Sequence, residues 1–328
     1  MESVDVKTKA KEEAIDNAPQ PSRTVRPAMK KSTKNMIFYC IMFTIPVLWF
    51  SYFYVGVNVN SIIMAFQKYD FSTGDYVWAG WLNFRNFFRQ WADATAMLTM
   101  LKNSLYGFLC TLGIGMPLGL LFSFYIYKKK PGYAIFKVIL FLPSIISAMV
   151  LAVMFKNFTE STLPPLMEKW FGLEMQGLLS NNDTQFGTIL FYNVWIGFGS
   201  GILLYSGAMS RVPESIVESA QLDGISPVKE FFYITFPLIF GTVSTFIITG
   251  VAGLFTNQLN MYNLFSDGVN PASMTFGYYL FKGIAAASST ADYPYYAAIG
   301  LCLTIVAVPI TWGVKFLCDK FGPENVEY

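Results

Sequence analysis

Hydrophobic residues form six long runs along the chain, and none of these runs contains a charged side chain. A helix that crosses a bilayer core needs about 20 predominantly apolar residues, and its backbone groups must bond within the segment. A helical bundle in water would instead require a polar face on each helix, and the runs show none. The pattern predicts six spanning helices: Met36–Val57 (or as far as Phe66), Asn103–Tyr127, Val138–Phe155, Thr184–Ser210, Pro237–Asn257 and Tyr293–Val314.

Composition supports an all-α integral membrane protein. The 328 residues are 54% hydrophobic and 13% charged, whereas a soluble domain carries about 25% charged residues. Aromatic residues, at 17%, suit two interfacial belts of Trp and Tyr in contact with membrane lipid. The basic residues form no stripe interleaved with aromatics, so no nucleic acid is expected as a partner.

The placement of Lys and Arg predicts the orientation, because cytoplasmic loops carry an excess of both. Sixteen of the 23 basic residues lie in the N-terminal tail, at the C-terminus, or in the connections after the second and fourth runs. Both termini are therefore predicted to be cytoplasmic. Residues 1–34 are polar and contain three prolines, which predicts a disordered cytoplasmic tail ahead of a transmembrane domain at residues 35–328.

The two cytoplasmic connections differ in composition. Lys128-Lys129-Lys130-Pro131-Gly132 is short, and we interpret it as a tight turn that supplies only the positive-inside signal. The connection over residues 210–236 is longer. In it Pro213 suits a first helical position, Gly224 suits the residue after a helix end, and Ser226-Pro227 suits the start of a second helix. The first helix has two faces at helical spacing: Glu214, Glu218 and Gln221 on one, and Ile216, Val217 and Ala220 on the other.

This longer connection carries a family resemblance. Five residues match, position for position, the E-A-A, G and I-x-L-P signature of membrane subunits of binding-protein-dependent ABC importers: Glu218, Ala220, Gly224, Ile234 and Pro237. Ser219 stands where the family usually has Ala, and Phe236 where it usually has Leu. Both departures keep a small or apolar character. We call residues 210–236 the coupling loop.

Further fragments resemble the maltose-permease-type sugar permeases of that family: Gly80-Trp81-Leu82-Asn83-Phe84, Phe141-Leu142-Pro143, Trp195-Ile196-Gly197-Phe198 and Arg211-Val212-Pro213-Glu214. The resemblance covers the chain from Gly80 to the C-terminus. It implies a six-transmembrane-helix ABC importer permease core in a bacterial cytoplasmic membrane. It also implies that the chain forms half of a pathway for sugars or oligosaccharides, with a non-sugar solute as the alternative within the family.

The resemblance implies a mechanism for the coupling loop. Its short helix would dock on a separate ATPase subunit, and closure of two such subunits would rock the membrane bundles between inward- and outward-facing states. The implied coupling residues are Glu214, Glu218, Ser219, Ala220, Asp223 and Gly224. The alternative is an amphipathic helix at the lipid interface, which glutamates facing an anionic leaflet disfavour.

The chain has no nucleotide-binding motif of its own. It contains no G-x-x-x-x-G-K-[ST] sequence and no Gly-Lys dipeptide, so we expect no enzymatic activity and no cofactor, with ATP bound by the partner ATPase. The absence of histidine excludes Ser-His-Asp triads and His metal sites. The four cysteines are interpreted as buried thiols. The resemblance further implies a second homologous permease and an extracytoplasmic solute-binding protein.

Polar and aromatic residues in and after the fourth and fifth runs are candidates for solute contact. Planar amides suit sugar hydroxyls, and aromatic faces suit sugar C–H surfaces. The candidates are Asn193, Trp195, Asn257, Gln258, Asn260 and Tyr262. The alternative is that the amides bond neighbouring helices, a common use of polar residues in lipid, and the sequence does not separate the two.

Two other functions compete with an ATP-driven importer. A secondary carrier or channel normally has buried carboxylates or broken helices at mid-membrane, and the uncharged spans disfavour such coupling within this chain. A membrane-embedded enzyme requires a nucleophile with a base, or a metal site, and the sequence shows neither.

Overall fold

The computed structural model describes residues 31–92, 95–266, 268–285 and 290–323. The chain divides into two units, Met1–Val59 and Asn60–Tyr328. Most of the predicted tail lies outside the described residues, and its last four residues, 31–34, are helical.

The described part of the first unit is one continuous helix that runs into the start of the second unit. It consists of α2 (Lys31–Trp49), the π-helical η1 (Phe50–Gly56) and α3 (Val57–Ala65). Within it, Asn35–Ala65 is long and apolar enough to cross a membrane. The helix therefore takes the longer of the two predicted lengths, ending one residue before Phe66.

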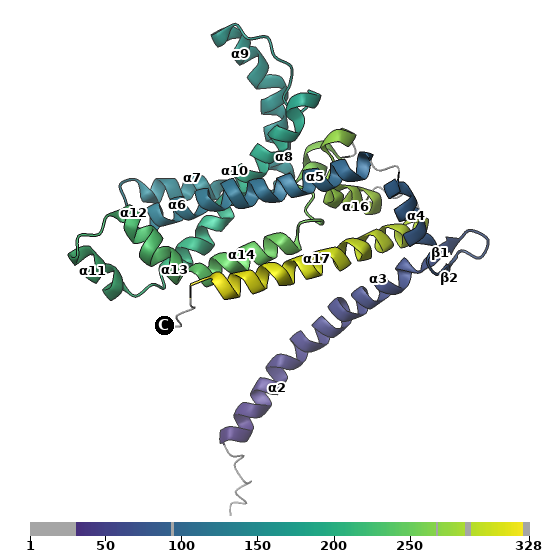
Figure 1. The fold of residues 1–328 in the computed structure, drawn as a ribbon, viewed down its shortest axis with the longest axis horizontal. Helices are drawn as coiled ribbons and strands as arrows, with labels where there is room; N and C mark the ends of the chain where they lie inside the picture. The colour runs from purple at the N-terminus through teal and green to yellow at the C-terminus, as the bar shows by residue number, and fades with distance from the viewer. Residues whose placement is uncertain (1–30, 93–94, 267, 286–289, 324–328) are drawn as a thin grey trace, which may run out of the picture. The chain divides into compact units, whose positions relative to one another are not determined.

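The second unit contains a short hairpin and a series of helices (Figure 1). The elements are β1 (Gln67–Asp70), β2 (Asp75–Trp78), α4 (Leu82–Ala92), α5 (Thr95–Cys110), η2 (Thr111–Gly115), α6 (Met116–Tyr127), α7 (Tyr133–Ile145), α8 (Ala148–Asn157), η3 (Phe158–Thr162), α9 (Leu163–Phe171), α10 (Asn182–Met209), α11 (Glu214–Leu222), α12 (Pro227–Glu230), η4 (Phe231–Thr235), α13 (Phe236–Leu238), α14 (Phe240–Ala252), α15 (Met261–Phe265), η5 (Pro271–Ser273), α16 (Phe276–Ala285), η6 (Thr290–Asp292) and α17 (Tyr293–Phe321).

The described residues contain four helices long and apolar enough to cross a membrane: Asn35–Ala65, Thr95–Tyr127, Asn182–Met209 and Thr290–Phe321. Two bent pairs raise the number to six if each pair is one span. Tyr133–Ile145 and Ala148–Phe171 meet at 101°, and Pro227–Leu238 and Phe240–Ala252 meet at 71°. The helical, membrane-spanning class is confirmed, with four to six candidate spans among the described residues.

The predicted third and fifth spans are not continuous helices. The third breaks where Ile146 (φ −75°, ψ 143°) and Ser147 (φ −53°, ψ 130°) leave the helical region. The fifth breaks at Ile239 (φ −97°, ψ 4°). Each break follows a proline closely, Pro143 in one case and Pro237 in the other. A proline inside a helix removes a backbone hydrogen bond and clashes with the preceding turn, and hydrophobicity alone does not show where the chain then bends.

The hairpin was not predicted from the sequence. Strands β1 and β2 pair antiparallel, with Gln67 opposite Trp78. The buried Asn83 side chain fixes the hairpin to the end of α3, because its Nδ2 donates to the carbonyl oxygens of Ala65 (2.9 Å) and Gln67 (2.7 Å). Gly80 has a φ of 57°, which favours glycine. The Gly80–Phe84 fragment therefore holds the hairpin in place.

Helix α10 packs against α6 and α7, and α14 packs against α17 (Figure 1). The approach of α7 to α10 depends on one glycine. A Cβ at Gly199 would overlap the backbone carbonyl oxygen of Leu140 in α7. By contrast, a Cβ at Gly197 would meet no atom within 4 Å.

We predict opposite effects for alanine at these two glycines. Gly199→Ala should destabilise the protein by about 1–3 kcal/mol, because α7 must move away from α10. Gly197→Ala is the matched control, and its helix propensity should leave stability unchanged or raised. The melting temperatures of the two detergent-solubilised variants test the prediction, and equal melting temperatures would contradict it.

Candidate functional site

The coupling loop folds as two helices around a glycine. Helix α11 covers Glu214–Leu222 and α12 covers Pro227–Glu230. Pro213 precedes α11 as its N-cap residue, with ψ 127°, so the helix begins one residue later than predicted. Gly224 has a φ of 74°, as expected for a glycine after a helix end. Ile225 N donates to Ala220 O at 3.2 Å and Gly224 N to Gln221 O at 3.0 Å, which closes the C-terminus of α11.

Helix α11 has the two faces predicted from its spacing. Glu214, Glu218 and Gln221 are exposed, whereas Val217 is buried and Ile216 and Ala220 are half-buried. Val217 belongs to a hydrophobic cluster, here called the inner cluster, which joins α6, α10, α11, η4 and α14. Its buried members are Leu120, Tyr205, Met209, Val212, Val217, Phe231, Ile239 and Val243. The inner face of α11 is therefore packed onto α6, α10, η4 and α14.

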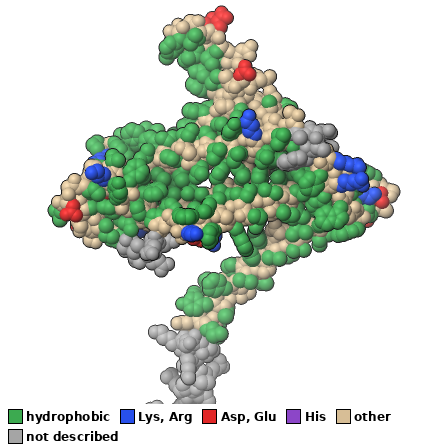
Figure 2. Space-filling view, viewed as in Figure 1, with side chains coloured by type: hydrophobic (Ala, Val, Ile, Leu, Met, Phe, Trp, Pro, Cys, Tyr) green, Lys and Arg blue, Asp and Glu red, His purple; other side chains and the backbone are tan. Residues whose placement is uncertain are grey.

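The outer surface of the coupling loop combines charge with exposed apolar side chains. Leu222, at the end of α11, is 89% exposed, and Val228 in α12 is 67% exposed. Ser219 is exposed and donates only to Ser215 O, at 2.8 Å. Figure 2 shows acidic side chains at the left edge, where Figure 1 places α11. An amphipathic helix with small, acidic and apolar groups on its outer side suits contact with another protein.

The turn after α6 has a role that the sequence did not indicate. Lys128 Nζ lies 2.5 Å from Glu230 Oε1, at the end of α12, and the two side chains are only 14% and 3% exposed. It is the one ion pair found among the described residues. The interpretation of this turn as a charge signal alone is therefore wrong for Lys128. Removing one member of a buried pair costs about 3–5 kcal/mol, because the other charge stays buried without a partner.

A cavity of about 350 Å3 lies between α5, η2, α10 and α14 and is the candidate solute site. Asn193 and Asn257 line it, together with Ser200, Tyr205 and Thr249. No charged side chain lines it. Two of the six predicted solute residues are therefore brought to one cavity.

The Asn193 amide is engaged within the protein. Its Nδ2 donates to Leu259 O at 2.6 Å and to Ile189 O at 2.9 Å, and its Oδ1 accepts from Asn260 Nδ2 at 2.8 Å. Leu259 and Asn260 have φ values of 49° and 53°, a conformation that non-glycine residues rarely adopt. The geometry therefore favours the alternative interpretation of these two amides, as groups that hold the loop after α14.

The other candidates lie in different surroundings. Asn257 is exposed, and among the described residues its side-chain amide has one hydrogen bond, in which Oδ1 accepts from Leu259 N at 2.9 Å. Gln258 is half-buried, and its buried Oε1 has no hydrogen-bond partner among the described residues. Trp195 packs on Phe155, with ring centroids 6.0 Å apart, and Tyr262 packs edge-on against Phe281 at 4.9 Å. Asn257 is thus the candidate whose amide nitrogen is free to meet a solute in the cavity.

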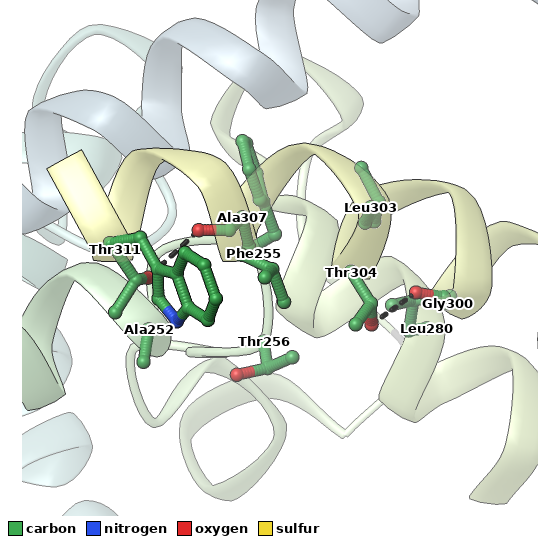
Figure 3. A pocket seen from close by; sticks show the side chains of 11 residues that line it. Ala252, Phe255, Thr256, Leu280, Gly300, Leu303, Thr304, Ala307 and Thr311 are labelled. Carbon is green, nitrogen blue, oxygen red and sulfur yellow. Dashed lines mark hydrogen bonds between the residues drawn. The ribbon is translucent and has the colours of Figure 1, made fainter.

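A second cavity, of about 230 Å3, lies between α14, α16 and α17 (Figure 3). Apolar side chains dominate its lining, among them Phe255, Leu280 and Leu303. Its hydroxyls on α17 are engaged by their own helix, since Thr304 donates to Gly300 O and Thr311 to Ala307 O, both at 2.8 Å. It is therefore less suited to a sugar than the cavity beside Asn257.

No other chemical site is evident in the described part of the chain. It contains no group of three or more His, Cys, Asp or Glu residues that could hold a metal ion. The four cysteines are free, and none is fully buried: Cys40 is exposed and Cys110, Cys302 and Cys318 are half-buried. The expectation of buried thiols is thus wrong for the chain by itself, because apolar residues of a membrane protein also face outward, toward lipid.

Comparisons with known proteins agree with the architecture. A family model described as "Binding-protein-dependent transport system inner membrane component" matches residues 112–322. The arabinooligosaccharides transport system permease protein AraP of Bacillus subtilis (strain 168) is 27% identical over 323 residues, covering 94% of this chain and 99% of AraP. The maltose/maltodextrin transport system permease protein MalF of Escherichia coli (strain K12) is 26% identical over 204 residues, covering 60% of this chain and 39% of MalF.

A solved structure shares the fold. A chain from the crystal structure of a bacterial ABC transporter involved in the import of the acidic polysaccharide alginate superposes with a TM-score of 0.72 and 20% identity. The match covers 88% of this chain and 96% of the other.

We predict that Gly224→Ala loosens the end of α11. A side chain at a φ of 74° costs about 1–2 kcal/mol. The Gly224 and Ile225 amide hydrogens should therefore exchange with solvent about 5- to 30-fold faster. Gly207→Ala in α10 is the control, because a Cβ there meets no atom within 4 Å. Hydrogen-exchange mass spectrometry makes the measurement, and unchanged exchange in the loop would contradict the prediction.

Proposed function

The chain belongs to the family of binding-protein-dependent transport system inner membrane components, as a permease subunit of an ABC importer, and we propose that its solute is a neutral sugar or oligosaccharide. The named functions of AraP and MalF support a carbohydrate. The 350 Å3 cavity agrees with this, because amides and hydroxyls line it and no charged group does. A neutral non-sugar solute is the alternative.

Helix α11 is the observation that carries the coupling mechanism. Its inner face is fixed in the inner cluster through Val217, while Glu218 and Leu222 face outward. A partner ATPase that closes on ATP would push this outer surface, and the rigid helix would pass the movement to α6, α10 and α14. ATP would bind to the ATPase, and this chain would hold no cofactor and catalyse no reaction.

Family membership supports a proposal for the complete assembly. Each bent pair would count as one span, giving six, with both termini and the coupling loop in the cytoplasm of a bacterial cell. Two ATPase subunits, a second homologous permease and an extracytoplasmic solute-binding protein would complete the importer. Broken spans also occur in secondary carriers, so the breaks in the third and fifth spans do not distinguish an importer from a carrier or channel. Family membership and α11 favour the importer.

Reversal of charge at Glu218 tests the docking role. Glu218→Lys should leave the amount of protein in the membrane unchanged, because the side chain is exposed. It should reduce uptake about tenfold or more, since like charges placed across an interface cost several kcal/mol. Lys130→Glu, also exposed on the predicted cytoplasmic side, is the control and should leave uptake unchanged. The assay compares uptake of labelled arabinotriose and maltotriose with copurification of the ATPase.

Two outcomes would overturn this assignment. Wild-type protein that transports alone, without any ATPase, would favour the carrier. Normal uptake and normal ATPase copurification by Glu218→Lys would reject the docking role of α11.

A change at Asn257 tests the solute cavity. Asn257→Ala should raise the half-saturation concentration for uptake by about two- to tenfold, the effect of one lost hydrogen bond. Thr304→Val in the other cavity is the control and should leave uptake unchanged, because that hydroxyl bonds only its own helix. An unchanged uptake curve for Asn257→Ala, or a changed one for Thr304→Val, would move the solute site away from Asn257.

A further inference from the structure

The Lys128–Glu230 pair joins the end of α6 to the coupling loop. Lys128 is the C-cap residue of α6, and Glu230 is the last residue of α12 in the coupling loop. The Lys128 ammonium lies 5.9 Å from the ring centre of Phe124 and 5.8 Å from that of Tyr127. Phe124 also packs against Phe231, with ring centroids 5.1 Å apart. The charged pair is therefore enclosed by the aromatic side chains of the two elements that it links.

The helix held by Lys128 leads directly to the solute cavity. Thr95–Tyr127 is one continuous helical segment, and Phe108, Thr111 and Gly115 in its middle line the 350 Å3 cavity. A movement of α12 would therefore pass through Glu230 and Lys128 to the helix Thr95–Tyr127. This continuous helix would carry the movement to a wall of the cavity.

A buried ion pair transmits movement differently from apolar packing. Hydrophobic contact is non-directional, whereas an ion pair joins two particular side chains, here one at the end of α6 and one at the end of α12. Separating the two charges would leave the Glu230 carboxylate, whose side chain is only 3% exposed, without its partner. Lys129 and Lys130 in the same turn are exposed and can supply the positive-inside signal without Lys128. The burial of Lys128 beside Glu230 therefore calls for a role other than topology.

We propose that Lys128 and Glu230 are positioning residues that tie the second helix of the coupling loop to helix Thr95–Tyr127. The pair makes that helix move with the ATPase. This rests on the proposed coupling function, because it requires an ATPase that pushes on the loop. It adds a second route into the membrane, separate from the contact of α11 with the inner cluster.

The experiment uses the complete importer, with this chain, its partner permease and the ATPase in proteoliposomes. The four native cysteines are replaced by Ala, and Leu112→Cys places one thiol in the cavity wall. The measured quantity is the rate at which a membrane-impermeant maleimide labels this thiol, with and without ATP. No solute needs to be known for this measurement.

The test variant is the neutral pair Lys128→Met with Glu230→Gln, which removes the link and leaves no buried charge unpaired. It should accumulate in the membrane, bind the ATPase and hydrolyse ATP. Its ATP-dependent change in labelling should be about 2- to 30-fold smaller than that of the wild type, the range over which such network residues alter coupling. Lys128→Arg, which keeps the charge, should retain the change. Lys130→Met is the matched control and should behave as the wild type.

Each outcome decides the question. A neutral pair that labels as the wild type does, with and without ATP, overturns the proposal. So does a neutral pair that fails to accumulate, because the ion pair then serves folding alone. If labelling of the wild type itself does not respond to ATP, the proposed function fails, which is distinct from a loss confined to the neutral pair.

Discussion

The absence of water in the hydrocarbon core is the constraint on which this structure depends. Every backbone N–H and C=O placed there must find a partner in the protein, and unbroken helices meet that demand without help. The backbone of the loop after α14 does not form regular helical hydrogen bonds, and side chains supply some of its partners instead. Asn193 binds the Leu259 carbonyl oxygen at 2.6 Å, and Asn257 accepts from the Leu259 amide at 2.9 Å. Irregular backbone of this kind is tolerated where protein or a water-filled cavity surrounds it, and here it borders the candidate solute cavity.

The same constraint explains how few charges the interior contains. Among the charged side chains that the structure describes, Glu230 is buried, and Lys128 is its partner. That pair stands where the coupling loop meets the end of α6. An isolated charge in this position would be costly, and here each of the two charges has the other as its partner. The inner cluster and the ion pair therefore give the coupling loop both an apolar and a charged attachment.

The sequence predicted the features that depend on composition and local spacing. Uncharged runs marked the helices, and the alternation of Glu218 with Val217 and Ala220 marked the two faces of α11. Gly224 adopted the left-handed conformation expected after a helix end. Contacts between distant segments could not be predicted, because no spacing links Lys128 to Glu230 or Asn83 to Ala65. The breaks at Ile146 and Ile239 were missed because tertiary packing, and not hydrophobicity, decides how a helix bends near a proline. Trp195 and Tyr262 have suitable chemistry for a sugar, but packing turns both toward other aromatic rings.

The π-helical segment η2 has a geometric consequence for the cavity. It interrupts the helix Thr95–Tyr127 at Thr111–Gly115, where Thr111, Leu112 and Gly115 line the cavity. A π-turn takes up one residue more than an α-turn, so the side chains on either side of η2 are out of phase by about 100° relative to an uninterrupted α-helix. The helical segments before and after η2 thus present different faces to the same neighbouring helices.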